Sequence, residues 1–149
     1  MQRFEGEKDF PQAPADLFAR LSDVRFLVQC LPDVESVPEA TPEHAKVVLR
    51  PRLAFVRGTL NVTVQIVDPV PPTSARLLLD SKGIGSSAKV EARLDLTPHE
   101  TGSRVHWVAD ITQLGGLLKL VPGGLIRGAA QKVLNDVLTS AEAKLKETA

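Results

Sequence analysis

The spacing of apolar residues changes once along this chain, at Pro122, and that change limits the folds that it can adopt. Before Pro122, apolar and polar residues alternate in Thr59–Val67, Ala88–Leu96 and Arg104–Thr112, which is the period of a half-buried strand. After Pro122, apolar residues recur at steps of three and four up to Leu145, which is the period of a helix. The pattern therefore predicts antiparallel strands followed by one long helix.

The first third of the chain contains the signals for further strands and for two short helices. Residues alternate in Phe4–Phe10, and Pro14 suits the first turn of a helix. Asp23 can cap a second helix, which must end before Pro32. Further strands are predicted at Val34–Val37, Ala45–Arg50 and Ala75–Ser81.

The long helix and the strands can bury their apolar faces in one simple way. A helix from Gly123 to Leu145 is about 34 Å long, and the sheet must curl around it to cover it. We therefore predict an α+β fold in which a curved antiparallel sheet of six to seven strands wraps around a long C-terminal helix. Two short helices follow the first strand. The length of 149 residues suits one domain, spanning 1–149.

The curvature of the sheet bears on function, because a strongly curved sheet touches a straight helix over only part of its length. We therefore expect an apolar cavity between them. A filled core is the alternative interpretation of the same residues. The predicted walls and cover of the cavity are Val62, Val64, Leu77, Leu79, Val90, Ala92, Leu94, Trp107, Ala109, Ile126, Ala130 and Val133.

Composition favours binding over catalysis. The 18 Lys and Arg balance the 18 Asp and Glu, which argues against a nucleic-acid binder, whose affinity depends on positive charge. Cys30 is the single cysteine, so an internal disulfide and a multi-thiolate metal site are excluded. The acidic, non-apolar N-terminus indicates a cytoplasmic protein. We expect no catalytic residue, metal or cofactor.

Several smaller motifs have a structural and a functional interpretation. Gly83–Ala88 has the spelling of a dinucleotide-binding loop, but a strand pattern follows it, so a hairpin turn is favoured. His106 is expected on the outer face of its strand, and Cys30 in the core. His44 and His99 fall in turn-like contexts and are also expected at the surface. A basic cluster of Arg50, Arg52 and Arg57 fits a solvated loop or the mouth of the cavity.

The apolar, glycine-rich segment 114–126 joins the last strand to the long helix. It is too short and too interrupted to span a bilayer. One interpretation is a buried hinge; the other is an apolar lip through which a ligand enters, in transient contact with a membrane or a protein. The contact residues of the lip would be Leu117, Leu118, Leu120 and Leu125.

Motifs along most of the chain resemble those of one known family. They are Phe4-Glu5-Gly6-Glu7, Pro14–Asp23, Cys30-Leu31-Pro32-Asp33-Val34-Glu35, Gly58-Thr59-Leu60, Gly102–Asp110 and the glycine-rich entry to the last helix. In this order they resemble the family of the carbon monoxide dehydrogenase subunit CoxG, within the START-related, birch-pollen-allergen-like (SRPBCC) superfamily.

The resemblance implies a helix-grip fold with a hydrophobic pocket. It also implies an accessory role near a molybdenum-containing hydroxylase or a quinone pool. The function expected is the binding or carriage of a small hydrophobic ligand such as a lipid or a quinone. Two alternatives remain: a cyclase-like or hydrolase-like enzyme of the same fold, similar to polyketide cyclases, and an assembly protein that uses the lip at 114–126.

Overall fold

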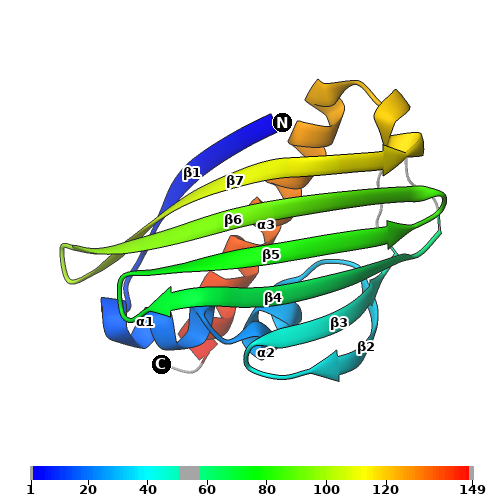
Figure 1. Cartoon of the computed structure of the whole chain (residues 1–149). Helices are drawn as coiled ribbons and strands as arrows, with labels where there is room; N and C mark the ends of the chain where they lie inside the picture. The colour runs from blue at the N-terminus through cyan, green and yellow to red at the C-terminus, as the bar shows by residue number, and fades with distance from the viewer. Residues whose placement is uncertain (1, 51–57, 148–149) are drawn as a thin grey trace.

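Seven antiparallel strands form one sheet in the order β1-β7-β6-β5-β4-β3-β2 in a computed structural model, which describes residues 2–50 and 58–147. The elements are β1 (Gln2–Phe10), α1 (Pro14–Leu21), α2 (Val24–Cys30), β2 (Val34–Ala40), β3 (His44–Leu49), β4 (Leu60–Val70), β5 (Ser74–Gly83), β6 (Ser86–His99), β7 (Gly102–Gly116), the 3-10 helix η1 (Leu117–Leu120) and α3 (Gly123–Glu147). The sheet arches over α3, and α1 and α2 lie beside the C-terminal half of α3 (Figure 1). The predicted architecture is confirmed.

The last strand is longer than its sequence pattern predicts. Lys89 pairs with Gln113 and Val90 with Ile111, so Thr112 is left over as a β-bulge. The bulge keeps Ile111 and Leu114 on the same inner face although they are three residues apart. Simple alternation therefore ends at the bulge, whereas the strand continues to Gly116.

The turn between β5 and β6 confirms the hairpin interpretation of the glycine motif. Gly83 pairs with Ser86 across a two-residue loop. Ile84 and Gly85 have φ values of 57° and 68°, the left-handed conformation that a tight hairpin of this length needs. The strand β6 follows this turn, so the motif lacks the helix N-terminus that a dinucleotide-binding loop uses.

The edge strand β2 is irregular. Its pairing with β3 shifts register between Val34 and Ser36 and again between Ser36 and Glu39. Most of its side chains are exposed. The opposite edge, β1, is regular, and its residues Phe4 and Phe10 are buried in the core.

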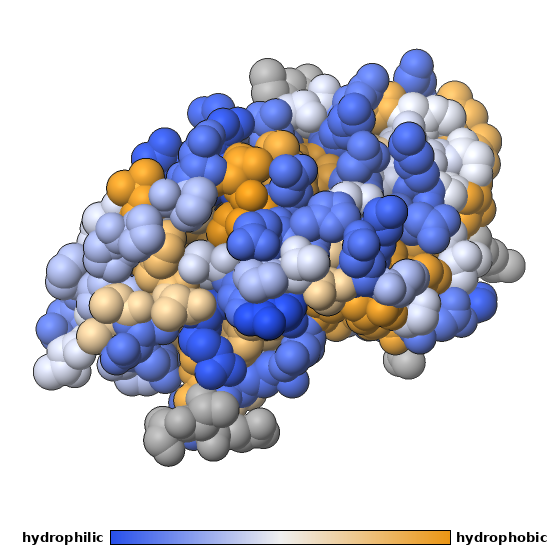
Figure 2. Space-filling model, turned by 60° about the horizontal axis from the view of Figure 1, so that its bottom comes forward, coloured by the Kyte–Doolittle hydropathy of each residue, from blue (hydrophilic) through white to orange (hydrophobic). Residues whose placement is uncertain are grey.

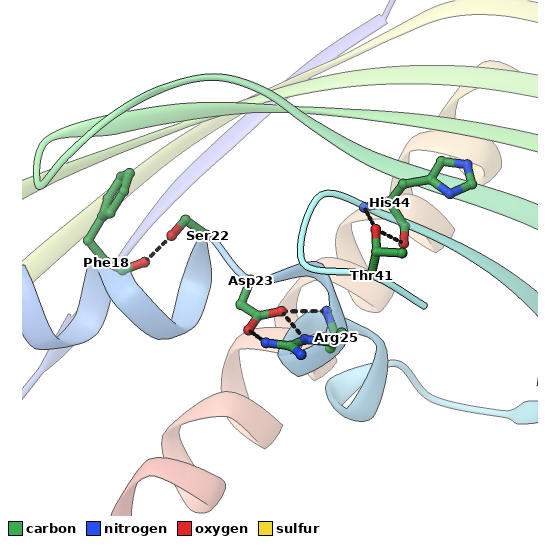
Figure 3. A network of polar contacts seen from close by, with 6 residues as sticks. All are labelled: Phe18, Ser22, Asp23, Arg25, Thr41 and His44. Carbon is green, nitrogen blue, oxygen red and sulfur yellow. Dashed lines mark hydrogen bonds and ion pairs between the residues drawn. The ribbon is translucent and has the colours of Figure 1, made fainter. Parts of the chain in front are cut away.

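Hydrogen bonds fix the corner where the two short helices meet the β2–β3 turn (Figure 3). The Ser22 hydroxyl donates to the Phe18 carbonyl at 2.6 Å. The Asp23 carboxylate caps α2 by accepting from the Arg25 backbone N–H at 2.9 Å and also pairs with the Arg25 guanidinium. The Val24 backbone N–H donates to the Pro42 carbonyl at 2.8 Å, which attaches α2 to the β2–β3 turn.

This cap predicts a pH-dependent contribution to stability. The Arg25 guanidinium beside Asp23 holds the pKa of that carboxyl below its ordinary value of 3.8, so the charged cap stabilises the fold above that pH and is lost as the pH falls below it. We expect Asp23→Ala to lower the free energy of unfolding by roughly 1 kcal/mol at pH 7, with a smaller difference near pH 3. Asp23→Asn, which keeps a capping oxygen, is the control. A pH-independent difference in urea titrations would contradict this assignment.

Candidate functional site

The inner face of the sheet and the facing side of α3 form one apolar core. Trp107 is 2% exposed and packs edge-to-face against Phe4, with ring centroids 5.8 Å apart. Gly6 pairs with Trp107 across the β1–β7 ladder and leaves room for the indole, because an added Cβ would lie 2.5 Å from the ring. Of the predicted cavity residues, those buried in this core are Val62, Val64, Leu77, Ala92, Leu94, Trp107, Ala109 and Ile126.

The other four predicted cavity residues are only half-buried: Leu79, Val90, Ala130 and Val133. Leu79 and Val90 pair with each other across β5 and β6. Both side chains project from the inner face of the sheet, although they are partly exposed. We infer that, among the described elements, α3 covers this part of the inner face incompletely. Further half-buried apolar residues of the core are Leu60, Leu114, Leu118, Val121, Leu134 and Val137.

The two ends of the core therefore differ. At the closed end, Leu138, Ala141 and Leu145 of α3 are buried. Among the other elements, α3 packs against α2 and β1. Lys8 of β1 also points inward and forms an ion pair with Glu142 of α3 at 3.6 Å. We call the other end, formed by the β5–β6 turn, η1 and the first two turns of α3, the open end.

A small apolar pocket lies at the open end, with a volume of about 60 Å³. This is less than half of the ~150 Å³ that accommodates benzene in an engineered cavity, so the pocket as it stands admits only one end of a ligand. Its lining residues are Leu60, Gly83, Ile84, Ser86, Leu117, Leu118 and Val121. Of these, the sequence predicted only the two leucines of the lip as contacts.

A larger groove of about 290 Å³ lies on the outer face of the sheet. Its charged residues are all paired: Arg3 with Asp110 at 2.8 Å, Arg76 with Glu91 at 3.7 Å, and Arg93 with Asp95, which lies outside the groove, at 3.1 Å. The Arg3 guanidinium lowers the pKa of Asp110 by a hydrogen bond. The charges are thus already compensated within the protein.

Large apolar side chains are exposed at the open end. Leu117 is 57% exposed, Leu120 81% and Leu125 56%, whereas Leu118 is half-buried against the core. Ile84, at 37%, lies in the adjacent turn. On the face seen in Figure 2, hydrophobic patches are separated by hydrophilic residues. The predicted lip is therefore an exposed apolar surface and not a buried hinge.

The structure places the histidines at the surface, as predicted. The side chains of His44, His99 and His106 lie 3.4 to 3.5 Å from carboxylates and are a third or more exposed. Cys30 is buried, and burial raises the pKa of its thiol, which makes it a poor nucleophile. Of the predicted basic cluster, Arg50 pairs with Glu35 at 3.1 Å, and Arg52 and Arg57 lie outside the described residues.

The part of the chain that the structure describes contains neither a cluster of metal ligands nor a helix that could span a membrane. Within residues 2–50 and 58–147, no three His, Cys, Asp or Glu side chains gather closely enough to hold a metal ion. None of the described helices has both the length and the hydropathy needed to cross a bilayer. The cytoplasmic location stays a prediction.

Several solved structures have the same fold as this chain. A conserved protein from Geobacillus kaustophilus superposes with a TM-score of 0.88 at 18% identity, over 99% of this chain and 97% of that one. A START superfamily protein from Mycobacterium smegmatis gives 0.71 at 12% identity, over 99% of both chains, and Ara h 8.0201 gives 0.70 at 18%, over 98% of both. The chain thus has the helix-grip fold of the START-related, birch-pollen-allergen-like superfamily.

A family within that superfamily also matches the sequence. The family model for the carbon monoxide dehydrogenase subunit CoxG matches residues 6–146. The chain belongs to this family, as its motifs predicted. No functionally curated protein matches it.

Proposed function

We propose that this protein binds or carries a small hydrophobic ligand, such as a lipid or a quinone, between the inner face of the sheet and α3. The observation that carries the proposal is the half-buried state of inward-facing aliphatic residues at the open end, Leu79, Val90 and Ala130 among them. A filled core would bury them as completely as it buries Val64 and Ala109. An apolar ligand that covers them gains about 25 cal/mol per Å² of apolar surface removed from water.

Uptake of a ligand larger than the present pocket requires the open end to widen. The first two turns of α3 contain Gly123, Gly124 and Gly128, and each glycine weakens a helix by about 1 kcal/mol relative to alanine. Gly124 and Gly128 also have no neighbouring atom within 4 Å of an added Cβ. This half of α3, together with η1, is therefore the part of the cover that is displaced at least cost.

We further propose that the exposed lip serves as the contact through which the ligand is received or delivered. Leu117, Leu120 and Leu125 present apolar surface beside the pocket, with Leu118 at its inner edge. The partner of this contact is a membrane surface or a protein. We also propose an accessory role beside a molybdenum-containing hydroxylase, in the cytoplasm. In support of the accessory role, the family is described as a subunit of carbon monoxide dehydrogenase.

A binding experiment on the delipidated protein tests the carrier function. We expect the fluorescence of 1-aminoanthracene to rise on binding with a saturable, one-site profile, because binding at the open end transfers the probe from water to an apolar surface. Native mass spectrometry of protein purified without delipidation should show a copurified apolar molecule. Failure of the probe to bind, together with a bare protein mass, would contradict the carrier function.

An assembly role without a ligand is the second candidate, since the lip leucines are exposed irrespective of the pocket. It predicts a bare protein mass in the same experiment. The enzyme alternative has less support, because the inward positions of β5, β6 and β7 carry no ionisable side chain that could act as acid or base.

A further inference from the structure

Two serine side chains interrupt the aliphatic inner wall at the open end. Ser81 of β5 pairs with Val62 of β4 on one side and with Ala88 of β6 on the other. Paired residues of an antiparallel sheet project from the same face, and Val62 is buried in the core, so Ser81 projects inward. Ser86 projects inward as well, since it lies two residues before Ala88 on the same strand.

These two serines are close neighbours in the hairpin. Ser81 pairs with Ala88, and Gly83, two residues after Ser81, pairs with Ser86. The two hydroxyl groups are therefore diagonal neighbours on one face of the sheet, on either side of Gly83, where an added Cβ would lie 2.5 Å from the Thr59 carbonyl oxygen. Ser86 also lines the small pocket.

Within the described residues, neither hydroxyl has a hydrogen-bond partner. The third serine on the inner face, Ser103 of β7, shows the usual arrangement. It is fully buried and donates to the Gln12 carbonyl at 2.7 Å. Ser81 and Ser86 are half-buried, so water satisfies them until a ligand displaces it. A ligand that lacks a polar atom at this place would leave both hydroxyl groups unpaired at a cost in affinity.

The surroundings of the two serines indicate which polar group they receive. The inward-facing neighbours of the two serines on β4, β5 and β6 are aliphatic residues or glycine. The side chains of Lys82 and Lys89 project from the outer face of the sheet. Among the described residues, no cation faces this place, so a carboxylate brought here would lose water without gaining a counter-ion from them, which is strongly unfavourable. An uncharged oxygen needs only a hydroxyl donor or acceptor.

We propose that Ser81 and Ser86 form a polar subsite for one uncharged oxygen, a hydroxyl or a carbonyl, of an otherwise apolar ligand. The subsite rests on the proposed carrier function and specifies how the ligand is oriented. The oxygen lies beside the β5–β6 turn at the open end, and the apolar part extends towards Val90 and Ala92.

The test compares octane with 1-octanol as displacers of 1-aminoanthracene from the wild type and from Ser81→Ala/Ser86→Ala. For each protein we take the ratio of the dissociation constants of octane and 1-octanol. The two ligands differ in water solubility, and this difference cancels when the ratio is compared between the wild type and the variant. We expect the double variant to shift this ratio about five- to tenfold against the alcohol, which corresponds to one hydrogen bond or slightly more. Octane should bind the double variant at least as tightly as the wild type, because the variant has no hydroxyl groups at this place to leave unpaired.

Ser87→Ala is the matched control, since Ser87 is the adjacent serine on the outer face, with its Oγ towards Gly115. It should leave the ratio unchanged. An unchanged ratio in the double variant overturns the subsite while leaving the carrier function intact. If the wild type prefers octanoate to 1-octanol and the double variant does not, the proposal that the subsite receives an uncharged oxygen is overturned. If no displacer binds any variant, the carrier function fails and the subsite fails with it; thermal melts verify that all variants are folded.

Discussion

Replacing Ala130 with phenylalanine is expected to abolish uptake of an apolar probe while leaving the fold intact. Ala130 lies on the half of α3 that covers the open end and is only half-buried. Under the proposed function, the added phenyl ring occupies the place of the ligand. We expect at least a tenfold loss of affinity for 1-aminoanthracene, or about 1.4 kcal/mol or more, and a melting temperature close to that of the wild type.

Thr139→Phe is the control for this prediction, because Thr139 is exposed on the same helix. It should bind the probe normally. Ala92→Phe is a less clean alternative, since Ala92 is buried and overpacking a filled region costs about 1–3 kcal/mol of stability. Unchanged uptake by Ala130→Phe would show that the ligand site is elsewhere.

Replacing Trp107 with alanine is expected to have the largest effect on stability. The side chain is almost completely buried and packs on Phe4. Truncation of a large buried aromatic residue costs about 3–5 kcal/mol, which corresponds to a fall in melting temperature of roughly 10 °C for a chain of this length. Circular dichroism melts measure this directly.

Val108→Ala is the comparison for the tryptophan variant. Val108 is the next residue on β7, projects from the outer face and is half-buried. Its truncation should lower the melting temperature by far less. Equal losses for the two variants would mean that the sheet buries both faces to a similar extent, contrary to the core described above.

The fold was predictable because two periodicities in the sequence each have one structural cause. Alternation in Ala88–Leu96 reflects one buried face of a strand, and the three- and four-residue steps after Pro122 reflect one buried stripe of a helix. The end of β7 was not predictable in this way, because the bulge at Thr112 shifts the phase of alternation. A bulge depends on the partner strand, which a local pattern does not contain.

The candidate site was predictable only in part. Alternation identifies the inward residues but not the degree to which α3 covers them, so Leu79 and Ala92 looked alike in the sequence although one is half-buried and the other buried. Ser86 was interpreted only as part of a glycine-rich turn. Its position two residues before Ala88 was the available signal for an inward side chain.

The free edges of the sheet have a consequence for self-association. An unpaired strand edge can template strand addition between copies and lead to aggregates, and proteins prevent this with inward-facing charges, prolines and irregular edges. On β1 the Lys8–Glu142 pair sets a charge on the inner side of the edge. On β2, Pro38 lies within the second of two register shifts, between Ser36 and Glu39. Fibril-like growth by strand addition at either edge is therefore disfavoured, even though leucines of the lip are exposed to solvent.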